Sequence, residues 1–352
     1  MKIVTIVGAR PQFIKAAVIS REFKQNRTDI NQIIIHTGQH YDKSMSDIFF
    51  NQLHIPQPNY NLNIGGGSHG ENTGRMIEKI EEILLVEKPN FLLVYGDTDS
   101  TLAGALAASK LQIPIIHIEA GLRSYNRKMP EEINRVLTDH ISYLLFCPSK
   151  KSYHNLINEG IDKNKIYIVG DVMLDAFNFY IKYAQKPTWW DSINLPLNEY
   201  VLCTIHRAEN TNQIINLSNI FNGLGNSKLP ILLPMHPRTK KILSNFKIDI
   251  PHNIFIVEPV GYLEMIWLQK NCKIIATDSG GIQKEAFFHK KPCITLREET
   301  EWVELVEMGF NKITGTDSNL ICDSLLNINF SNFDELIYGD GDTAIKISSL
   351  IK

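Results

Sequence analysis

The chain alternates between short runs of hydrophobic residues and longer stretches in which apolar residues recur with a helical period. Continuous apolar runs separated by helical stretches are typical of parallel strands that helices cover on both faces. In the first half of the chain this pattern predicts strands at Ile3–Val7, Gln32–His36, Phe91–Tyr95, Ile115–Ile118, Leu144–Cys147 and Ile166–Val169. We therefore expect a first α/β domain with a doubly wound parallel sheet.

The same pattern begins again after about Asp171. It predicts strands at Tyr200–Ile205, Ile231–Met235, Ile254–Val257, Lys273–Ala276 and Pro292–Thr295. Prolines interrupt regular structure, so the proline-containing segment Met173–Pro196 is expected to be a hinge region. A chain of 352 residues is too long for one ordinary core and suits two, which implies a cleft between them.

We expect three parts in the chain. These are an N-terminal Rossmann-like domain at 1–172, a C-terminal Rossmann-like domain at 173–335, and a C-terminal helix at 336–352 that packs back on the first domain.

Composition narrows the class of protein. The residues are 43% hydrophobic and 21% charged, as in a soluble globular protein, and the net charge is -2. The basic residues form no stripe, which argues against a nucleic-acid partner. The apolar start, Met1–Gly8, is too short for a signal peptide or a membrane span. Five scattered cysteines without a CxxC pair argue against a disulfide framework or a zinc site, so we expect a cytoplasmic protein.

Polar residues at the carboxyl ends of the predicted strands are the first candidates for function, since ligands bind there in open parallel sheets. After the first strand, Pro11 starts a helix whose N-terminus favours an anion, and Arg10 and Lys15 are placed to hold phosphate. The sequence here is neither G-x-G-x-x-G nor a Walker A loop, so no NAD or ATP site is expected. A basic pair on a solvated helix start is the alternative.

Acidic residues follow the next strands. Asp97 and Glu119 come after the third and fourth predicted strands, and Glu131 lies in the first turn of a helix. Removing a proton from carbon and returning one to the opposite face needs two acid/base groups in one pocket. Asp97-x-Asp99 is a weak metal pattern, so no metal is expected. For Glu131 alone, an ordinary acidic helix start is the alternative.

The second predicted domain also carries polar residues directly after its predicted strands. His206 and His236 each follow a strand and stand beside an arginine. Ser279, Gly280 and Gly281 then open a helix directly after a strand, where their backbone N–H groups suit a phosphate, and Glu285 suits a ribose diol. The alternatives are structural histidines and an ordinary tight turn.

Together these residues resemble the non-hydrolysing UDP-N-acetylglucosamine 2-epimerase family, and the resemblance runs from Gly8 to the Tyr338–Gly341 segment. It implies a GT-B-type pair of Rossmann-like domains with the active site in the cleft between them. It also implies an isomerase with a UDP-sugar substrate, no cofactor and no catalytic metal. The implied reaction is the reversible conversion of UDP-N-acetylglucosamine to UDP-N-acetylmannosamine, for bacterial surface polysaccharide.

The resemblance also assigns roles and a mechanism. UDP leaves by anti elimination to give a 2-acetamidoglucal, and it adds back with the other C2 configuration. The implied catalytic residues are Asp97, Glu119, Glu131 and His206. The implied substrate or UDP contacts are Arg10, Lys15, Arg135, His236, Ser279, Gly280, Gly281 and Glu285. A homodimer is expected, and the choice of the C2 base among the acids stays open.

Two departures from familiar members bear on the substrate. Ala9 and Gln12 stand where those members have Thr and Glu, and the loop Arg123–Pro130 is shorter and more basic. Both features look like the branch that acts on UDP-2,3-diacetamido-2,3-dideoxyglucuronate. With that substrate, we expect Arg127 or Lys128 of this chain to meet the C6 carboxylate. A solvated basic loop is the alternative.

Other functions also remain open at this point. They are a hydrolysing 2-epimerase, a GT-B glycosyltransferase and a catalytically silent nucleotide-sugar sensor. Some members of the family also bind UDP-N-acetylglucosamine at a second, activating site, and the matching motifs lie near Gln39, His40, Arg207 and His236. Tyr41–Lys43 departs from the usual residues after Gln-His, which argues against such activation in this chain.

Overall fold

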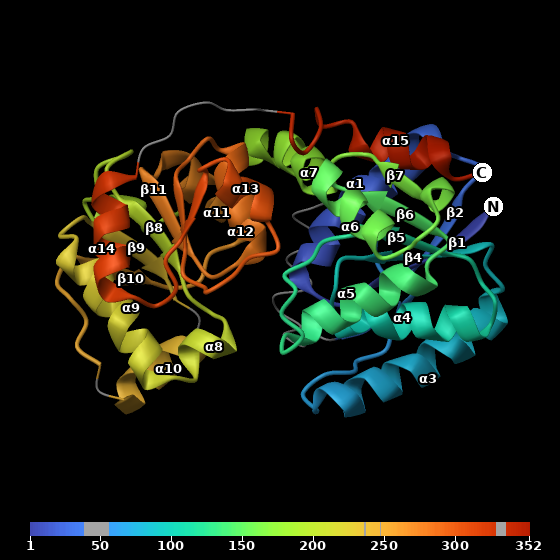
Figure 1. Cartoon of the computed structure of the whole chain (residues 1–352), viewed down its shortest axis with the longest axis horizontal. Helices are drawn as coiled ribbons and strands as arrows, with labels where there is room; N and C mark the ends of the chain where they lie inside the picture. The colour runs from blue at the N-terminus through green and yellow to red at the C-terminus, as the bar shows by residue number, and fades with distance from the viewer. Residues whose placement is uncertain (39–55, 236, 247, 329–335) are drawn as a thin grey trace. The chain divides into compact units, whose positions relative to one another are not determined.

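The computed structural model describes residues 1–38, 56–235, 237–246, 248–328 and 336–352 (Figure 1). The chain forms two compact units. One comprises Met1–Asn178 together with Asp334–Lys352, and the other comprises Phe179–Phe333.

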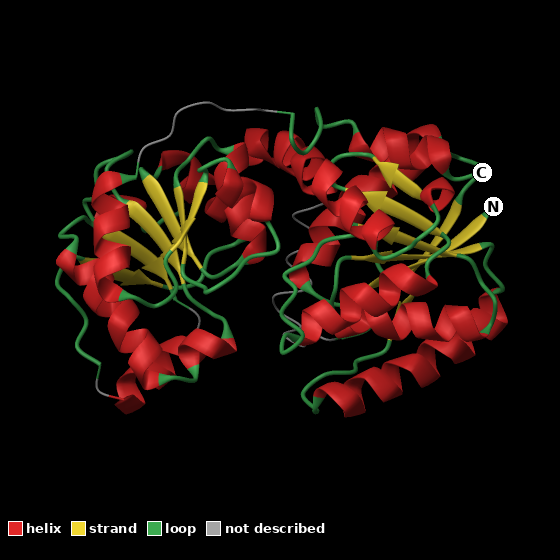
Figure 2. Ribbon diagram, viewed as in Figure 1, coloured by secondary structure: helices red, strands yellow, loops and turns green. Residues whose placement is uncertain are grey.

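The first unit is built on a parallel sheet of seven strands with helices on both faces (Figure 2). Its strand order is β3-β2-β1-β4-β5-β6-β7. The strands are β1 (Lys2–Val7), β2 (Asn31–His36), β3 (Tyr60–Asn61), β4 (Phe91–Tyr95), β5 (Ile115–Ile118), β6 (Leu144–Cys147) and β7 (Ile166–Ile168). The helices are α1 (Arg10–Asn26), α3 (His69–Glu87), α4 (Asp99–Lys110), α5 (Pro130–Ile141), α6 (Lys150–Asn158), α7 (Val172–Tyr180) and α15 (Thr343–Leu350), with a 3₁₀ turn at Lys163–Lys165.

Small residues bring α4 close to this sheet. The alanines of α4 are buried in the same core as strand residues such as Val94. A Cβ at Gly104 would lie 2.9 Å from the Ile6 side chain, so a larger residue has no room there. The helix begins where Thr98 caps it, since the Thr98 hydroxyl accepts from the Thr101 N–H. The turn before α4 is therefore held at a fixed place on the carboxyl edge of the sheet.

The second unit has a parallel sheet of six strands in the order β10-β9-β8-β11-β12-β13. The strands are β8 (Val201–Thr204), β9 (Ile231–Pro234), β10 (Ile254–Val257), β11 (Ile274–Thr277), β12 (Cys293–Thr295) and β13 (Asn311–Ile313). The helices are α8 (Ala208–Thr211), α9 (Ile214–Asn226), α10 (Pro237–Phe246), α11 (Tyr262–Asn271), α12 (Gly280–Phe288), α13 (Val303–Glu307) and α14 (Ser318–Asn327), with 3₁₀ turns at Ile181–Tyr183 and Trp190–Ser192.

The predicted fold class is confirmed, since each sheet is parallel and each begins with the strand order of a Rossmann fold, 3-2-1-4-5-6 counted along the unit. The sequence pattern did not predict two of the described strands, β3 and β13. These strands contain only two and three residues, and both include polar residues, so neither gives an apolar run.

The segment Met173–Pro196, expected to be a hinge region, begins as the regular helix α7, and the boundary between the two units, Asn178/Phe179, lies within it. The later part of the segment packs on the second unit. Trp190 is buried and packs against Tyr200 and Trp267, with ring centroids 5.2 and 4.9 Å apart.

The last residues of the chain pack on α1. Arg27 donates to the Ile351 carbonyl at 3.0 Å, and Ser348 donates to Glu22 at 3.0 Å. The start of α15 is held by Asp175 of α7, which accepts from the Ala344 N–H at 2.8 Å. These contacts join the two ends of the first unit.

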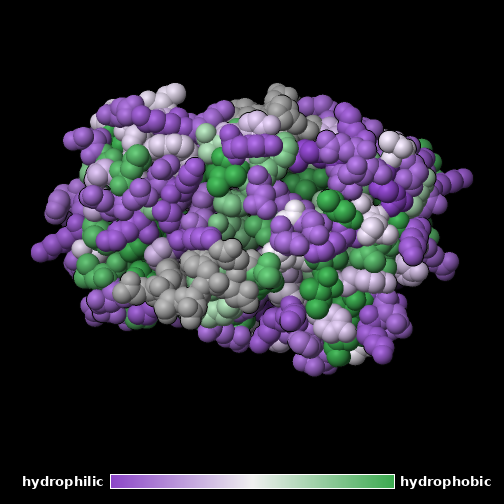
Figure 3. All heavy atoms as spheres, turned by 90° about the horizontal axis from the view of Figure 1, so that it is seen from above, coloured by the Kyte–Doolittle hydropathy of each residue, from purple (hydrophilic) through white to green (hydrophobic). Residues whose placement is uncertain are grey.

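Hydrophilic side chains cover much of the face shown in Figure 3, with smaller hydrophobic areas between them. Among the helices that the structure describes, none is both long and apolar enough to cross a membrane.

Candidate active site

The turns that follow β4 and β5 bring two predicted acids to one edge of the first sheet. Tyr95 is paired with Ile118 at the ends of the two strands, and the Gly96 N–H donates to the Ile118 carbonyl at 3.0 Å. Asp97 follows in one turn and Glu119 in the other. The register therefore places the two carboxylates on neighbouring turns.

Glu119 has an unusual backbone. Its φ of 73° lies in the left-handed region, which non-glycine residues rarely adopt and which often marks functional sites. Its side chain forms a buried ion pair with Lys15 of α1. A Cβ at Gly96, whose φ is 60°, would lie 3.1 Å from the Glu119 carboxylate, so a glycine suits this position. Lys15 and Glu119, predicted separately from the sequence, are thus brought together.

Asp97 is paired with a different cation. Its carboxylate accepts two hydrogen bonds from the Arg135 guanidinium, one of them at 3.2 Å from Nε, and about a third of the Asp97 side chain stays exposed. The neighbouring Asn134 donates to the Asp97 carbonyl at 2.9 Å. Helix α5 therefore fixes both the backbone and the side chain of this turn.

The two glutamates at the start of α5 differ in setting. Glu131, the predicted acid, is partly exposed, whereas Glu132 is buried. Glu132 accepts from Ser124 N–H at 2.9 Å, Tyr125 N–H at 3.0 Å and Arg135 at 2.6 Å. It links the basic loop to the arginine that holds Asp97. No sequence pattern distinguishes Glu132 from Glu131, because either glutamate suits a helix start.

A buried ionic network lies directly beneath the turn that carries Asp97. His117 donates from Nε2 to the Gly96 carbonyl at 2.8 Å and from Nδ1 to Asp139 at 2.7 Å, and Asp139 also accepts from Arg123 at 2.7 Å. Burial acts to raise the pKa of Asp139, but His117 and Arg123 outweigh it and hold that pKa below its ordinary value. None of these three residues was predicted from the sequence, because His117 stands inside an apolar run.

In the second unit, His206 lies beyond the end of β8 and is exposed. Its ring Nδ1 lies 2.9 Å from a carboxylate oxygen of Asp278, which follows β11 and is completely buried. Thr204 and Thr277, the last residues of these two adjacent strands, are paired in register. No role was predicted for Asp278 from the sequence, although it directly precedes the predicted phosphate-binding residues Ser279–Gly281.

Ser279, Gly280 and Gly281 lie where predicted, at the start of α12. Ser279 is the N-cap, and Gly280 packs so tightly that a Cβ would lie 2.2 Å from the Glu301 carboxylate. Glu285, further along the helix, accepts from Gln269 at 2.6 Å. Gln269 is fully buried and fixes this carboxylate, a role that no sequence pattern indicated.

Two predicted contacts are not described. His236 lies outside the described residues, and so do Gln39 to Lys43, which were considered for a second UDP-sugar site. Arg10 begins α1, but its side chain is likewise outside what the structure describes. Among the described residues no three or more histidine, cysteine, aspartate or glutamate side chains gather as metal ligands.

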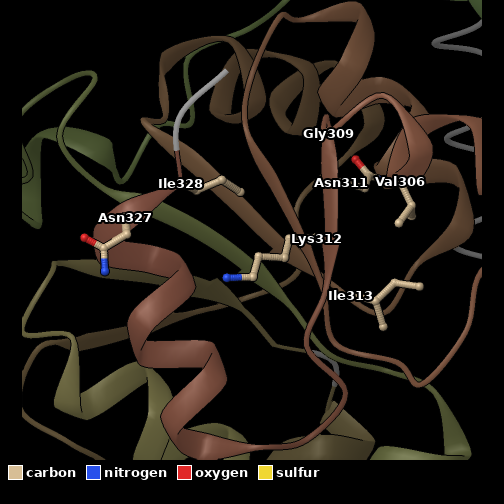
Figure 4. Close-up of a pocket in the computed structure, with 7 residues that line it drawn as sticks. All are labelled: Val306, Gly309, Asn311, Lys312, Ile313, Asn327 and Ile328. Atoms are coloured by element: carbon tan, nitrogen blue, oxygen red, sulfur yellow. The ribbon is translucent and has the colours of Figure 1, made fainter. Parts of the chain in front are cut away.

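One hollow in the second unit lies apart from these residues (Figure 4). It includes Asn311, the first residue of β13, and Ile328, just beyond the end of α14. It is lined by Val306, Gly309, Asn311, Lys312, Ile313, Asn327 and Ile328. Since β13 starts there, the hollow lies at the amino edge of the sheet, opposite to the edge that carries His206 and Ser279.

Comparison with known proteins gives a consistent result. A family model described as UDP-N-acetylglucosamine 2-epimerase matches residues 22–352. A UDP-N-acetylglucosamine 2-epimerase homolog of Methanococcus maripaludis is 53% identical and is matched over 100% of this chain and 99% of its own length. The UDP-2,3-diacetamido-2,3-dideoxy-D-glucuronate 2-epimerase of Pseudomonas aeruginosa is 49% identical over the same shares.

The fold agrees with solved structures. The UDP-GlcNAc 2-epimerase of Methanocaldococcus jannaschii, in complex with UDP-GlcNAc and UDP, has a TM-score of 0.91 and 45% identity, covering 100% of this chain and 99% of that one. The resemblance inferred from the sequence is confirmed. With the family model matching most of the chain and relatives aligning along all of it, this protein belongs to the UDP-N-acetylglucosamine 2-epimerase family and is an isomerase.

Proposed function

We propose that this protein interconverts UDP-N-acetylglucosamine and UDP-N-acetylmannosamine. The observation that carries the proposal is the pair of carboxylates, Asp97 and Glu119, on adjacent strand ends, each with its own cation. Two acid/base groups with different neighbours suit removal of a proton from one face of a carbon and its return to the other. The family membership supports the same reaction.

The chemistry follows from the substrate class. A base takes the C2 proton, the C2–H electron pair forms the C1=C2 double bond, and the C1–O pair leaves with UDP. UDP oxygen then adds to C1 while a proton reaches C2 on the opposite face. The C2 proton is weakly acidic, so positive groups near the departing diphosphate must help the C1–O bond to break.

We assign each unit its own part in substrate binding. The amino sugar belongs with Asp97, Glu119, Glu131, Lys15 and Arg135 of the first unit. UDP belongs with the second unit. The helix start at Ser279–Gly281 suits a phosphate, the carboxylate of Glu285 suits the ribose, and His206 and His236 belong with the diphosphate. Arg10, in the first unit, is kept as a proposed substrate or UDP contact.

A second candidate substrate is UDP-2,3-diacetamido-2,3-dideoxyglucuronate. It is supported by the basic loop, because the Glu132 carboxylate holds its backbone while Arg127 and Lys128 remain exposed. The Pseudomonas aeruginosa relative, named for that substrate, adds to the support. A C6 carboxylate is the group that distinguishes the two substrates.

A proton NMR time course in deuterated water, with each UDP-sugar separately, tests the proposal. We expect the C2 epimer to appear and to carry deuterium at C2. Release of free N-acetylmannosamine and UDP would instead identify a hydrolysing epimerase. An unchanged C2 centre with both sugars would contradict the proposal and favour a glycosyltransferase or a nucleotide-sugar sensor.

We further propose that the enzyme works in the cytoplasm as a homodimer and supplies a surface-polysaccharide precursor. Exposed apolar residues one turn apart on α5, Ile133 and Leu137, support a partner surface on the first unit. Light scattering after gel filtration tests the dimer. A monomeric mass at working concentration would contradict it.

A further inference from the structure

We propose that Asp278 is a positioning residue for the reaction. It fixes the ring of His206 with a proton on Nδ1, so that Nε2 is presented to the leaving diphosphate. The inference rests on the proposed function, in which His206 belongs with the diphosphate. Nothing in the sequence pattern assigned a role to Asp278, since its neighbours Ser279–Gly281 account for the phosphate site.

The two oxygens of Asp278 have different partners. Oδ2 accepts from the His206 N–H at 3.0 Å, from the Arg207 N–H at 3.0 Å and from Asn210 Nδ2 at 3.1 Å. Oδ1 faces the His206 ring, with Nδ1 at 2.9 Å, and accepts a longer bond of 3.2 Å from the His206 N–H. One oxygen therefore organises the loop, while the other contacts the ring.

A carboxylate oxygen only accepts hydrogen bonds, so the ring nitrogen that faces it must donate. Burial acts to raise the pKa of Asp278, but the hydrogen bond and charge of His206, with the amides of Arg207 and His206, outweigh it and hold that pKa below its ordinary value. Asp278 is thus ionised, and the His206 proton sits on Nδ1.

The shape of the imidazole then decides where Nε2 lies. The ring places Nε2 on the side away from Nδ1, and therefore away from the buried Asp278. His206 is exposed, with 55% of its side chain accessible, so the outer part of the ring is open to a ligand. When the ring is protonated, Nε2 donates to a phosphate oxygen while Nδ1 stays with Asp278.

This arrangement also couples two segments of the proposed UDP site. Asp278 accepts from the loop that follows β8, and its own chain continues into Ser279 and α12. The hydroxyl groups of Thr204 and Thr277 lie 2.6 Å apart just before it. The histidine and the phosphate-binding helix start are therefore held together through one buried carboxylate.

The substitution Asp278→Asn tests the inference, because it changes hydrogen bonding and leaves size unchanged. The amide oxygen is expected on the Oδ2 side, where three donors require an acceptor, and this places the amide NH₂ against His206 Nδ1. The NH₂ donates, so the ring is forced to carry its proton on Nε2. That neutral ring no longer brings a positive charge to the leaving diphosphate, because no carboxylate stabilises a second proton on Nδ1. We expect kcat to fall by about 100- to 1,000-fold, with UDP affinity changing by less than about 10-fold.

Nitrogen NMR of histidine-labelled protein reads the tautomer directly. In the wild-type enzyme the neutral His206 ring should carry its proton on Nδ1, and in Asp278→Asn on Nε2. A wild-type ring protonated on Nε2 would overturn the inference. This measurement needs only the wild-type protein and therefore decides even where the variant folds poorly.

A double-mutant cycle distinguishes an effect of Asp278 on the His206 ring from a general disturbance of the fold. In His206→Ala, the further change Asp278→Asn should cost less than about 3-fold in kcat, since the ring on which Asp278 acts is gone. A matched control is Asn210→Ala, which removes a donor to Asp278 without touching the ring and should keep kcat within about 5-fold.

These experiments distinguish failure of the positioning role from failure of the proposed function. If the wild-type enzyme epimerises neither UDP-sugar, the proposed function fails, whereas the tautomer seen by NMR still tests the hydrogen bond. If the wild-type enzyme epimerises one of the sugars, two results would overturn the positioning role. One is an Asp278→Asn variant with the wild-type rate. The other is a loss of kcat from Asp278→Asn that is as large in the His206→Ala background as in the wild type.

Discussion

At the scale of single residues, the carboxylates of the first unit are expected to be essential for turnover. Asp97→Asn, Glu119→Gln and Glu131→Gln each keep the shape of the side chain but remove its proton-transfer ability, so each should lower kcat by at least about 100-fold. Initial rates of epimerisation measure this, and circular dichroism checks folding. Near-wild-type rates in all three variants would remove the acid/base assignment.

The glycine pair at the start of α12 offers a matched comparison. A Cβ at Gly280 would lie 2.2 Å from the Glu301 carboxylate, whereas at Gly281 the nearest atom is Ser279 Oγ at 3.9 Å. Gly280→Ala must displace Glu301 and disturb the helix start, so we expect UDP affinity to fall by at least about 10-fold, or about 1.4 kcal/mol. Gly281→Ala should change it by less than about 3-fold. Calorimetry with UDP measures both, and equal effects would argue against the steric explanation.

At the scale of elements, the loop between β5 and α5 should determine substrate choice. Arg127 and Lys128 are exposed, while Glu132 holds the loop backbone. For a substrate with a C6 carboxylate, Arg127→Ala or Lys128→Ala removes a charge-assisted contact of about 1.5–3 kcal/mol and should raise KM by about 10- to 100-fold. KM for UDP-N-acetylglucosamine, which lacks that carboxylate, should barely change. Equal effects on both substrates, or none, would show that the loop is a solvated basic face.

At the scale of the whole molecule, Asp175 joins the two ends of the first unit and makes stability depend on pH. Burial raises its pKa from 3.8 to about 6. The folded state therefore holds the proton more tightly than the unfolded chain, and this contribution is complete below 3.8 and lost as pH rises through about 6. The difference corresponds to about 3 kcal/mol as an upper estimate.

The substitution Asp175→Asn isolates this effect, because its amide oxygen still accepts from the Ala344 N–H but does not titrate. We expect the difference in the free energy of unfolding, wild type minus Asp175→Asn, to decrease as the pH rises from about 4 to about 8. Urea unfolding at several pH values measures it. A constant difference across that range would mean that Asp175 does not keep its proton on folding.

The sequence by itself determined the strands and the residues at their ends. Buried parallel strands need continuous apolar runs, and helices such as α3, whose buried residues Met76, Ile80 and Leu84 are four positions apart, carry their own periodic pattern, so most elements were visible. Residues such as Asp97, Glu119 and Ser279 follow such runs directly, and parallel strands bring their carboxyl ends to one edge. β3 and β13 were missed because they are too short to give a pattern.

Only the tertiary structure decided which of these side chains meet. Lys15 and Glu119 are 104 positions apart, and His206 and Asp278 are 72 apart, so no local spacing relates them. The buried partners Glu132, Gln269 and Asp278 hold the candidate site residues in place, yet in the sequence they look like an ordinary helix or turn residue. A polar side chain buried in the fold must find a hydrogen-bond partner, and the packing of distant segments, which the sequence pattern does not specify, determines what that partner is.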